Sequence, residues 1–394
     1  MLQLARGYLA YELTGSAAVL GIVTLGQGLP QLMLSFFGGV IADRVKRRQL
    51  LLFSQSCLVV IGLITAVLVH TGLIQVWQLA VLAFAQGAVF AFNQPSRQAY
   101  MVELVAQEDV TNAIALYNSG QTCARIIAPS LAGLLISTSF IGLTYSFYFF
   151  AACYLIPVLM IFLIRAQPIV SQRVKAPMVT EFVDGLRYIS RHKVLRVLII
   201  AGIVPPLLGN SYQQLLPVFA SGKALGVGAS GLGLMSTFAG VGALLGSLAV
   251  ASFGNARRRG LIQLSAGAAF GVALVVFSLM HAFPAALASL LFVGFAATSY
   301  QTLNSTLIVN SSDPAYYGRV SSVQQVNGSL SSMATLPIGF FVDIFGAPAV
   351  VMFNGLFVAG FWCVIGLFVK SYRQIEMQRR PGMTGDLEKT EATI

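Results

Sequence analysis

The sequence predicts an all-α membrane protein in which twelve spans form two six-helix halves, with the first span truncated at its N-terminus. Three observations support this prediction. Of 394 residues, 57% are hydrophobic and only 9% are charged, whereas soluble domains contain about 25% charged residues. Apolar stretches long enough to cross a bilayer recur along the chain. When a shorter first stretch is counted with them, one polar segment divides the stretches into two sets of six.

Eleven stretches reach the length of about 20 apolar residues that a helix needs to cross the hydrocarbon core. A shorter stretch, 2–13, precedes them and extends only about 18 Å as a helix. We expect that its cytoplasmic half is missing because the true start lies about 20 residues upstream; the alternative is a tolerated, shortened helix. The eleven full stretches are 17–42, 50–71, 75–96, 111–137, 142–165, 195–219, 229–253, 260–281, 284–308, 320–345 and 348–370.

The longest polar segment between spans separates the two halves. Within it, Phe182, Leu186 and Ile189 recur at helical spacing opposite charged residues, which predicts an amphipathic helix on the inner membrane surface. The residues that follow the last span are polar and without periodicity, which indicates a disordered cytoplasmic tail. The predicted units are the N-terminal half, the linker, the C-terminal half and the tail, at 1–165, 166–194, 195–370 and 371–394.

Lysine and arginine are distributed unevenly between the loops. If the short first stretch ends outside, 21 of the 24 cations lie in inner loops or in the tail. Lys223 lies in an outer loop, and Arg6 and Arg125 lie inside spans. Because cytoplasmic loops contain an excess of Lys and Arg, the C-terminus is predicted to be cytoplasmic. The net charge of +11 is therefore a topology signal, and nucleic acid is excluded as a partner.

Cysteine and histidine patterns give no indication of a metal, a cofactor or an enzyme. The cysteines Cys57, Cys123, Cys153 and Cys363 lie in apolar stretches without paired spacing. The three histidines are far apart, and no glycine-rich phosphate-binding loop is present. A membrane-embedded enzyme is therefore the less favoured alternative to a transporter, and a non-transporting sensor would require a soluble domain that the sequence lacks.

A basic segment separates the first two full stretches. It consists of a glycine, three residues, Asp-Arg, two residues and two further arginines, at Gly39, Asp43, Arg44, Arg47 and Arg48. This pattern resembles the signature loop between spans two and three of the major facilitator superfamily, except that Lys46 replaces a second glycine. The resemblance implies that Asp43 contacts the start of span eleven and closes the cytoplasmic side as a gate. The alternative is a solvated acid at the membrane interface.

Further segments resemble the bacterial branch that includes enterobactin exporters and macrolide efflux proteins. They are Tyr11–Ser16, Asn93–Gln98, Val102–Val105 and Asp313–Ser322. The resemblance implies a monomeric, proton-coupled exporter of drug-like or siderophore-like small molecules, working by alternating access in the bacterial inner membrane. An importer or facilitator of a small metabolite is the alternative.

Two arginines are expected deep in the membrane. Arg125 lies about 21 Å along span five, and a central arginine costs about 2.5–3.5 kcal/mol on insertion scales unless it has a cavity or a partner. Around it, Ala128-Pro129 and Gly133 resemble a degenerate form of the family's antiporter motif, which predicts close packing and a bend. Arg6 is the second deep arginine. If both face the cavity, the substrate is acidic or phenolate-bearing; the alternative is a structural bridge.

Few acids could take up a coupled proton inside the membrane. Glu12 is the first candidate and Asp343 the second, with an interfacial carboxylate as the alternative for each. Pro205 and Pro206 are predicted to break or kink span seven. A broken helix exposes backbone groups only where they line a cavity. The polar residues expected to line this cavity include Gln31, Asn210, Tyr212, Gln213 and Asn304.

Overall fold

The described secondary structure is helical. A computed structural model describes residues 2–45, 47–106, 109–138, 142–164, 178–221, 225–252, 259–312, 320 and 333–368. The first seven helices are α1 (Leu2–Thr14), α2 (Ala17–Arg44), α3 (Arg47–His70), α4 (Val76–Glu103), α5 (Val110–Ser137), α6 (Gly142–Leu163) and α7 (Met178–Arg191). The later ones are α8 (Lys193–Gly209), α9 (Ser211–Ser221), α10 (Gly228–Ser252), α11 (Arg259–Ser278), α12 (Phe283–Ser311), Met333–Phe345 and α14 (Ala347–Phe368).

Most of these helices are long and apolar enough to cross a membrane. Within the described ranges, nine helical segments meet this criterion, with α8 and α9 forming one segment, Val194–Ser221. Met333–Phe345 is a shorter apolar helix, and α1 has 13 residues. The prediction of an all-α membrane protein is confirmed. One local expectation differs, because α2 remains helical to Arg44 and α3 begins at Arg47, so the basic motif lies largely on helices instead of a loop.

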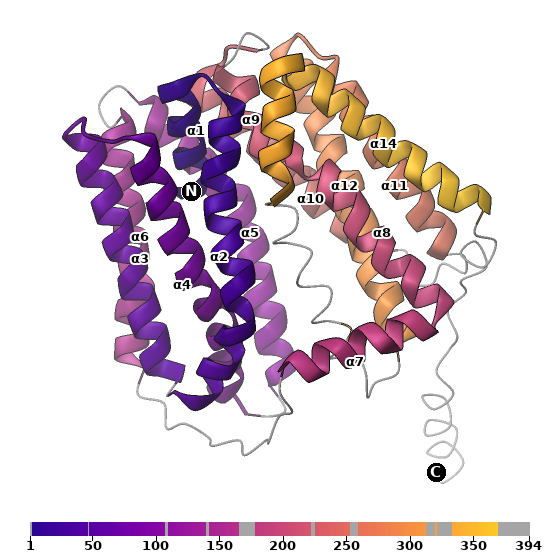
Figure 1. Cartoon of the computed structure of the whole chain (residues 1–394), viewed down its shortest axis with the longest axis horizontal. Helices are drawn as coiled ribbons and strands as arrows, with labels where there is room; N and C mark the ends of the chain where they lie inside the picture. Colours follow the sequence, from indigo (N-terminus) through magenta and orange to yellow (C-terminus); the bar gives the residue numbers. More distant parts are fainter. Residues whose placement is uncertain are drawn as a thin grey trace, which may run out of the picture.

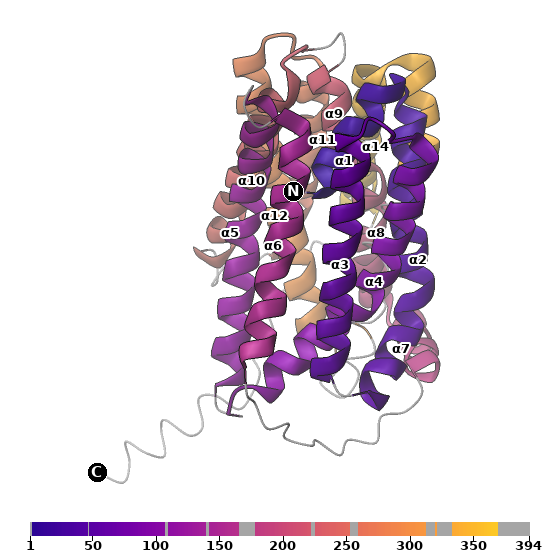
Figure 2. The ribbon, with the colours of Figure 1, turned by 90° about the vertical axis from the view of Figure 1, so that its left-hand side faces the viewer.

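The helices pack as two groups, which lie side by side in Figure 1. In the first helix group, α1–α6, α2 packs along α4, and α3 packs along α4 and α6. In the second helix group, α8–α14, α10 packs along α12, and α11 packs along α12 and α14. Figure 2 shows the first group from its outer side, with its long helices running roughly parallel. Each group surrounds a buried apolar cluster, and each cluster also includes residues of the other group: Ala17 and Leu20 of α2 in one, and Ala229 of α10 in the other.

The two groups touch through glycines on facing helices. A Cβ added to Gly133 of α5 would lie 2.6 Å from the Cα of Gly233 in α10. On the other side, a Cβ added to Gly21 of α2 would lie 2.8 Å from the Cα of Leu336, and one added to Gly339 would lie 2.9 Å from the Ala17 carbonyl carbon. Backbone is therefore packed directly against backbone, and only glycine allows this approach.

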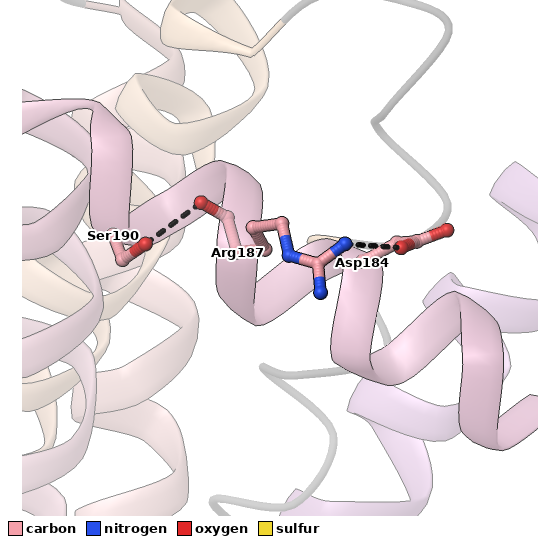
Figure 3. Close-up of polar contacts among 3 residues, drawn as sticks. All are labelled: Asp184, Arg187 and Ser190. Carbon is pink, nitrogen blue, oxygen red and sulfur yellow. Dashed lines mark hydrogen bonds and ion pairs between the residues drawn. The ribbon is translucent and has the colours of Figure 1, made fainter.

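Helix α7 lies across one end of the bundle, roughly perpendicular to the long helices (Figure 1). It contacts α2 and α8, and its Ile189 is buried in the apolar cluster of the second group. Its polar side carries two contacts, drawn in Figure 3: Arg187, which is exposed, lies 3.9 Å from the carboxylate of Asp184, and the Ser190 hydroxyl donates to the Arg187 carbonyl at 2.8 Å. Such exposed pairs add little stability, so apolar contacts hold α7 in place.

Candidate functional site

A carboxylate from the second helix group caps the start of α2. Asp343 accepts hydrogen bonds from the Ser16 hydroxyl at 2.5 Å, the Ala17 amide at 2.6 Å and the Ala18 amide at 3.0 Å. The first amides of a helix lack partners within the helix and favour negative charge. We call the contact between residues 16–21 and residues 335–343 the α2 junction. There the glycine contacts and the Asp343 cap join the two groups.

Arg6 is buried inside the first helix group. It is 2% exposed, and none of its three guanidinium nitrogens has a hydrogen-bond partner among the described residues. Its electrostatic neighbour is Tyr154 of α6, and Gln86 of α4 also interacts with that phenol. The next charged residue of α1, Glu12, is exposed. Arg6 and Glu12 are therefore in different surroundings.

A cavity of about 270 Å³ lies within the first helix group. Its lining is partly polar: the Asn93 amide donates to the Ser54 hydroxyl at 2.8 Å, and the guanidinium of Arg97 lies 5.2 Å from the centre of the Tyr117 ring. The lining comes from α1, α3, α4 and α6. It consists of Leu2, Gln55, Leu58, Phe90, Asn93, Arg97, Phe150, Cys153, Tyr154 and Pro157.

The polar residues predicted for the second group take several positions. Asn304 is buried and accepts a hydrogen bond from the Gln263 amide at 2.8 Å, which links α12 to α11. Tyr212 is also buried, and the amide of the exposed Gln213 lies within 3.4 Å of its hydroxyl. In the first group, Gln31 on α2 is half-buried.

The helix is interrupted at Asn210, between α8 and α9. This interruption lies just after Pro205 and Pro206, which were predicted to cause it. Pro205 and Pro206 lie buried inside α8, which ends at Gly209. Side chains form hydrogen bonds at this interruption: the Ser211 hydroxyl donates to the Leu208 carbonyl, and the amide of Asn354 donates to the Ser211 hydroxyl at 3.1 Å. The break is displaced from the prolines because the Pro206 carbonyl still accepts the Asn210 amide.

The structure describes the side-chain surroundings of only some of the remaining residues that the sequence predicts to be functional. Arg47 is half-buried, and Arg48 donates to the carbonyls of Ile161 and Phe162 at the end of α6, at 3.2 and 2.9 Å. Gly133 is buried at the contact with α10. The side-chain surroundings of the remaining ones lie outside the described residues: Gly39, Asp43, Arg44, Arg125 and Pro129.

Sequence reasoning missed several polar residues around these sites. Gln55 and Gln86 are single glutamines in apolar stretches, the same signal that identified Gln31. Asn354 could have been found in the same way. Tyr154 could not, because tyrosine is common in this chain and is compatible with lipid or core positions. Among the described residues, no three His, Cys, Asp or Glu side chains gather as metal ligands would.

Comparisons with known proteins identify the family. The family of transmembrane secretion effectors matches residues 1–335. Macrolide efflux protein A of Streptococcus pyogenes is 24% identical over 352 residues, covering 87% of this chain and 84% of the relative. The staphyloferrin A transporter of Staphylococcus aureus is 24% identical, covering 84% of this chain and 82% of the relative. The enterobactin exporter of Citrobacter koseri is 23% identical, covering 83% and 75%.

A solved structure shares the fold. The crystal structure of the nucleoside transporter NupG superposes with a TM-score of 0.71 at 14% identity, covering 94% of this chain and 96% of that one. The resemblance to macrolide efflux proteins and enterobactin exporters is confirmed. The chain is thus a transporter and not an enzyme, and it belongs to the transmembrane secretion effector family of the major facilitator superfamily.

Proposed function

We propose that this protein exports drug-like or siderophore-like small molecules across the bacterial inner membrane in exchange for protons. The names of its relatives support the substrate class, because they include a macrolide efflux protein, an enterobactin exporter and a transporter for staphyloferrin A. These relatives align over three quarters or more of their length. The protein acts as a monomer in the bilayer.

The proposed architecture has twelve spans in two halves. The first helix group supplies six spans, with α1 as a short first one, and α8 and α9 together form the seventh. Met333–Phe345 forms the outer part of the eleventh span. The halves are residues 1–165 and 195–370. Helix α7 lies in the cytoplasmic linker, 166–194, and the cytoplasmic tail, 371–394, lies outside the described residues. Lysine and arginine placement supports a cytoplasmic C-terminus.

The α2 junction is the observation that best supports alternating access. In the proposed orientation it lies at the outer ends of two spans from different halves, where Asp343 caps α2. Backbone contact at Gly21 and Gly339 seals the same place. We assign the described conformation to the inward-facing state, in which the outer side is closed. Export requires this junction to part and the Asp43 gate to close on the cytoplasmic side.

Asp343 and Arg125 are the residues through which we propose that protons act. A proton on Asp343 removes the negative charge at the start of α2 and weakens its acceptor oxygens, which favours parting of the α2 junction. Arg125, deep in α5, holds an anionic group of the substrate or responds to the coupled proton. Glu12, being exposed at the end of α1, is an alternative proton carrier.

Substrate uptake by energised inverted vesicles tests the proposal. Erythromycin, enterobactin and ethidium are offered with and without an uncoupler to wild type, Arg125→Ala and the matched control Arg187→Gln. Arg187 is an exposed cation on α7. We expect uncoupler-sensitive accumulation of at least one compound, reduced at least tenfold by Arg125→Ala and unchanged by Arg187→Gln. Accumulation that is the same with and without the uncoupler would indicate a facilitator and contradict proton coupling. If no compound accumulates, the proposed substrate class is wrong.

A further inference from the structure

Exposed cations gather where α7 meets α8. Arg191 is the last residue of α7, Arg196 lies in the first turn of α8, and both are exposed. Only His192 separates the two helices. From position 184 to 196 the sequence contains four Lys or Arg residues and one acid. We call residues 191–196 the α7–α8 corner. Clusters of Lys and Arg on an amphipathic helix, or just cytoplasmic of a span, are typical of sites for anionic lipids.

The protein does not neutralise the cations of this corner within the described part of the chain. The nearest described acid on α7, Asp184, lies 3.9 Å from Arg187, one turn before Arg191 (Figure 3). Among the described residues, neither Arg191 nor Arg196 has a carboxylate within salt-bridge distance. Both guanidinium groups are therefore available to an anion from outside the protein.

Helix α7 lies at the edge of the bundle, at the level where the long helices end. It runs roughly perpendicular to them in Figure 1, and it lies beside the lower part of α2 in Figure 2. Its Ile189 is buried in the second group, and Arg191 lies about 200° further around the helix, on the opposite side. The half-buried Tyr188 packs its ring 4.3 Å from that of His192. Tyrosine is enriched at membrane–water interfaces, so this position suits contact with lipid headgroups.

Exposed apolar residues accompany the two arginines. Leu186 on α7 is 45% exposed, and Ile200 on α8 is 49% exposed. Ile200 follows Arg196 by four residues, so the two side chains share one face of α8, with the isoleucine one turn further into the span. A phospholipid presents groups in the same order, with a phosphate at the surface and acyl chains below it. A soluble anion would use the cations alone and leave the apolar residues uncovered.

We propose that the α7–α8 corner is a binding site for an anionic phospholipid. The phosphate binds to Arg191 and Arg196, because a guanidinium donates two parallel hydrogen bonds to phosphate oxygens, and the acyl chains lie against Ile200 and Leu186. A lipid such as phosphatidylglycerol supplies a net negative charge, whereas phosphatidylcholine brings a cation of its own. Since α7 contacts α2 and is also packed into the second group, the bound lipid braces a helix that touches both groups.

Lipid titration of the purified full-length protein in detergent, followed by native mass spectrometry, tests the site. The probes are phosphatidylglycerol and phosphatidylcholine with the same acyl chains, and the affinity for the first bound lipid is measured. We expect wild type to bind phosphatidylglycerol at least tenfold more tightly, about 1.4 kcal/mol. Arg191→Gln and Arg196→Gln should each weaken phosphatidylglycerol binding about fivefold, which follows from about 1 kcal/mol per cation near an anionic surface. Equal affinity of wild type for both lipids, or wild-type affinity in both variants, would overturn the proposal.

Arg187→Gln is the matched control, because it removes one exposed cation from the same helix but one that lies beside Asp184. It should change the affinity for phosphatidylglycerol less than twofold. A loss as large as that of Arg191→Gln would show that binding follows net charge and would refute a defined site. Arg196→Lys keeps the charge and should bind the lipid more tightly than Arg196→Gln; if it does not, the charge at this position does not bind the phosphate.

A competition experiment separates a lipid from a free phosphate compound. Glycerol 1-phosphate has the phosphate of phosphatidylglycerol without its acyl chains, and at constant ionic strength it should not displace the lipid. Displacement would assign the α7–α8 corner to a soluble phosphate compound and contradict the lipid site. Because the titration measures no transport, failure of the proposed export leaves this test valid.

Discussion

Valine in place of Gly339 is expected to open the α2 junction. A Cβ at this position would lie 2.9 Å from the Ala17 carbonyl carbon and 3.0 Å from the Ala18 Cα. Both are backbone atoms of α2, so they cannot rotate away from the new side chain. Overpacking of this kind costs about 1–3 kcal/mol. Since about 1.4 kcal/mol is a tenfold change in an equilibrium, the ratio of closed to open junctions should fall about 5- to 160-fold.

Distance measurements between two spin labels detect this opening. Leu73→Cys, after α3, and His281→Cys, after α11, place labels on different helix groups at the end of the bundle where the α2 junction lies. Both positions are exposed, Leu73 by 65%. The native cysteines are replaced by serine. Wild type should give mainly one short distance, and Gly339→Val should raise the ratio of a longer-distance population to the short one by about 5- to 160-fold.

Gly360→Val is the matched control for this measurement. Gly360 lies within α14, and a Cβ added there would meet nothing within 4 Å. It reproduces the loss of a helical glycine and the gain of a β-branched residue without a clash. Its distance distribution should equal that of wild type. If Gly339→Val also keeps the wild-type distribution, the backbone contact does not hold the junction closed and the reasoning fails.

Four other changes test single contacts. Asp343→Ala should cost about 0.5–2 kcal/mol at the start of α2 and lengthen the same label distance, more than Ser16→Ala does; equal effects would refute the carboxylate cap. Gly133→Ala should lower the melting temperature because its Cβ meets Gly233, unlike Gly120→Ala, where nothing lies within 4 Å. Asn354→Leu should destabilise by about 0.5–1.5 kcal/mol by removing the hydrogen bond that the Asn354 amide donates to Ser211, measured in denaturant and judged against the double variant Ser211→Ala, Asn354→Leu. Arg48→Gln should speed hydrogen exchange at the end of α6, and unchanged exchange would contradict its bonds to the Ile161 and Phe162 carbonyls.

Hydropathy predicts the helices well because bilayer thickness fixes their length. The stretch 142–165 corresponds to α6 at Gly142–Leu163, and 17–42 corresponds to α2 at Ala17–Arg44. Helix α2 extends two residues beyond its apolar stretch because a helix can continue into the interface while its backbone bonds stay internal. Polarity therefore marks where the membrane ends, and backbone hydrogen bonding decides where the helix ends.

The sites were less predictable because they depend on which helices meet. Asp343 and Ser16 are 327 positions apart, and nothing local to either indicates the contact. The sequence also did not indicate which helix group the Arg6 side chain would face, because α1 has apolar residues against both groups. The sequence predicted that Arg6 lies deep in the membrane, and in the structure Arg6 is 2% exposed, but the sequence gave no sign that Tyr154 would be its electrostatic neighbour.

The glycine contacts at the α2 junction also bear on how fast the two groups can separate. Where large side chains of two helices interdigitate, they must leave their packed positions before the helices can separate. This requirement raises the energy barrier to separation. At Gly21 and Gly339 the facing surfaces are smooth backbone. Such surfaces lose their contacts together over a short displacement. Such a junction is closely packed when closed but has a low energy barrier to opening, which suits a protein that must repeat the motion at every turnover.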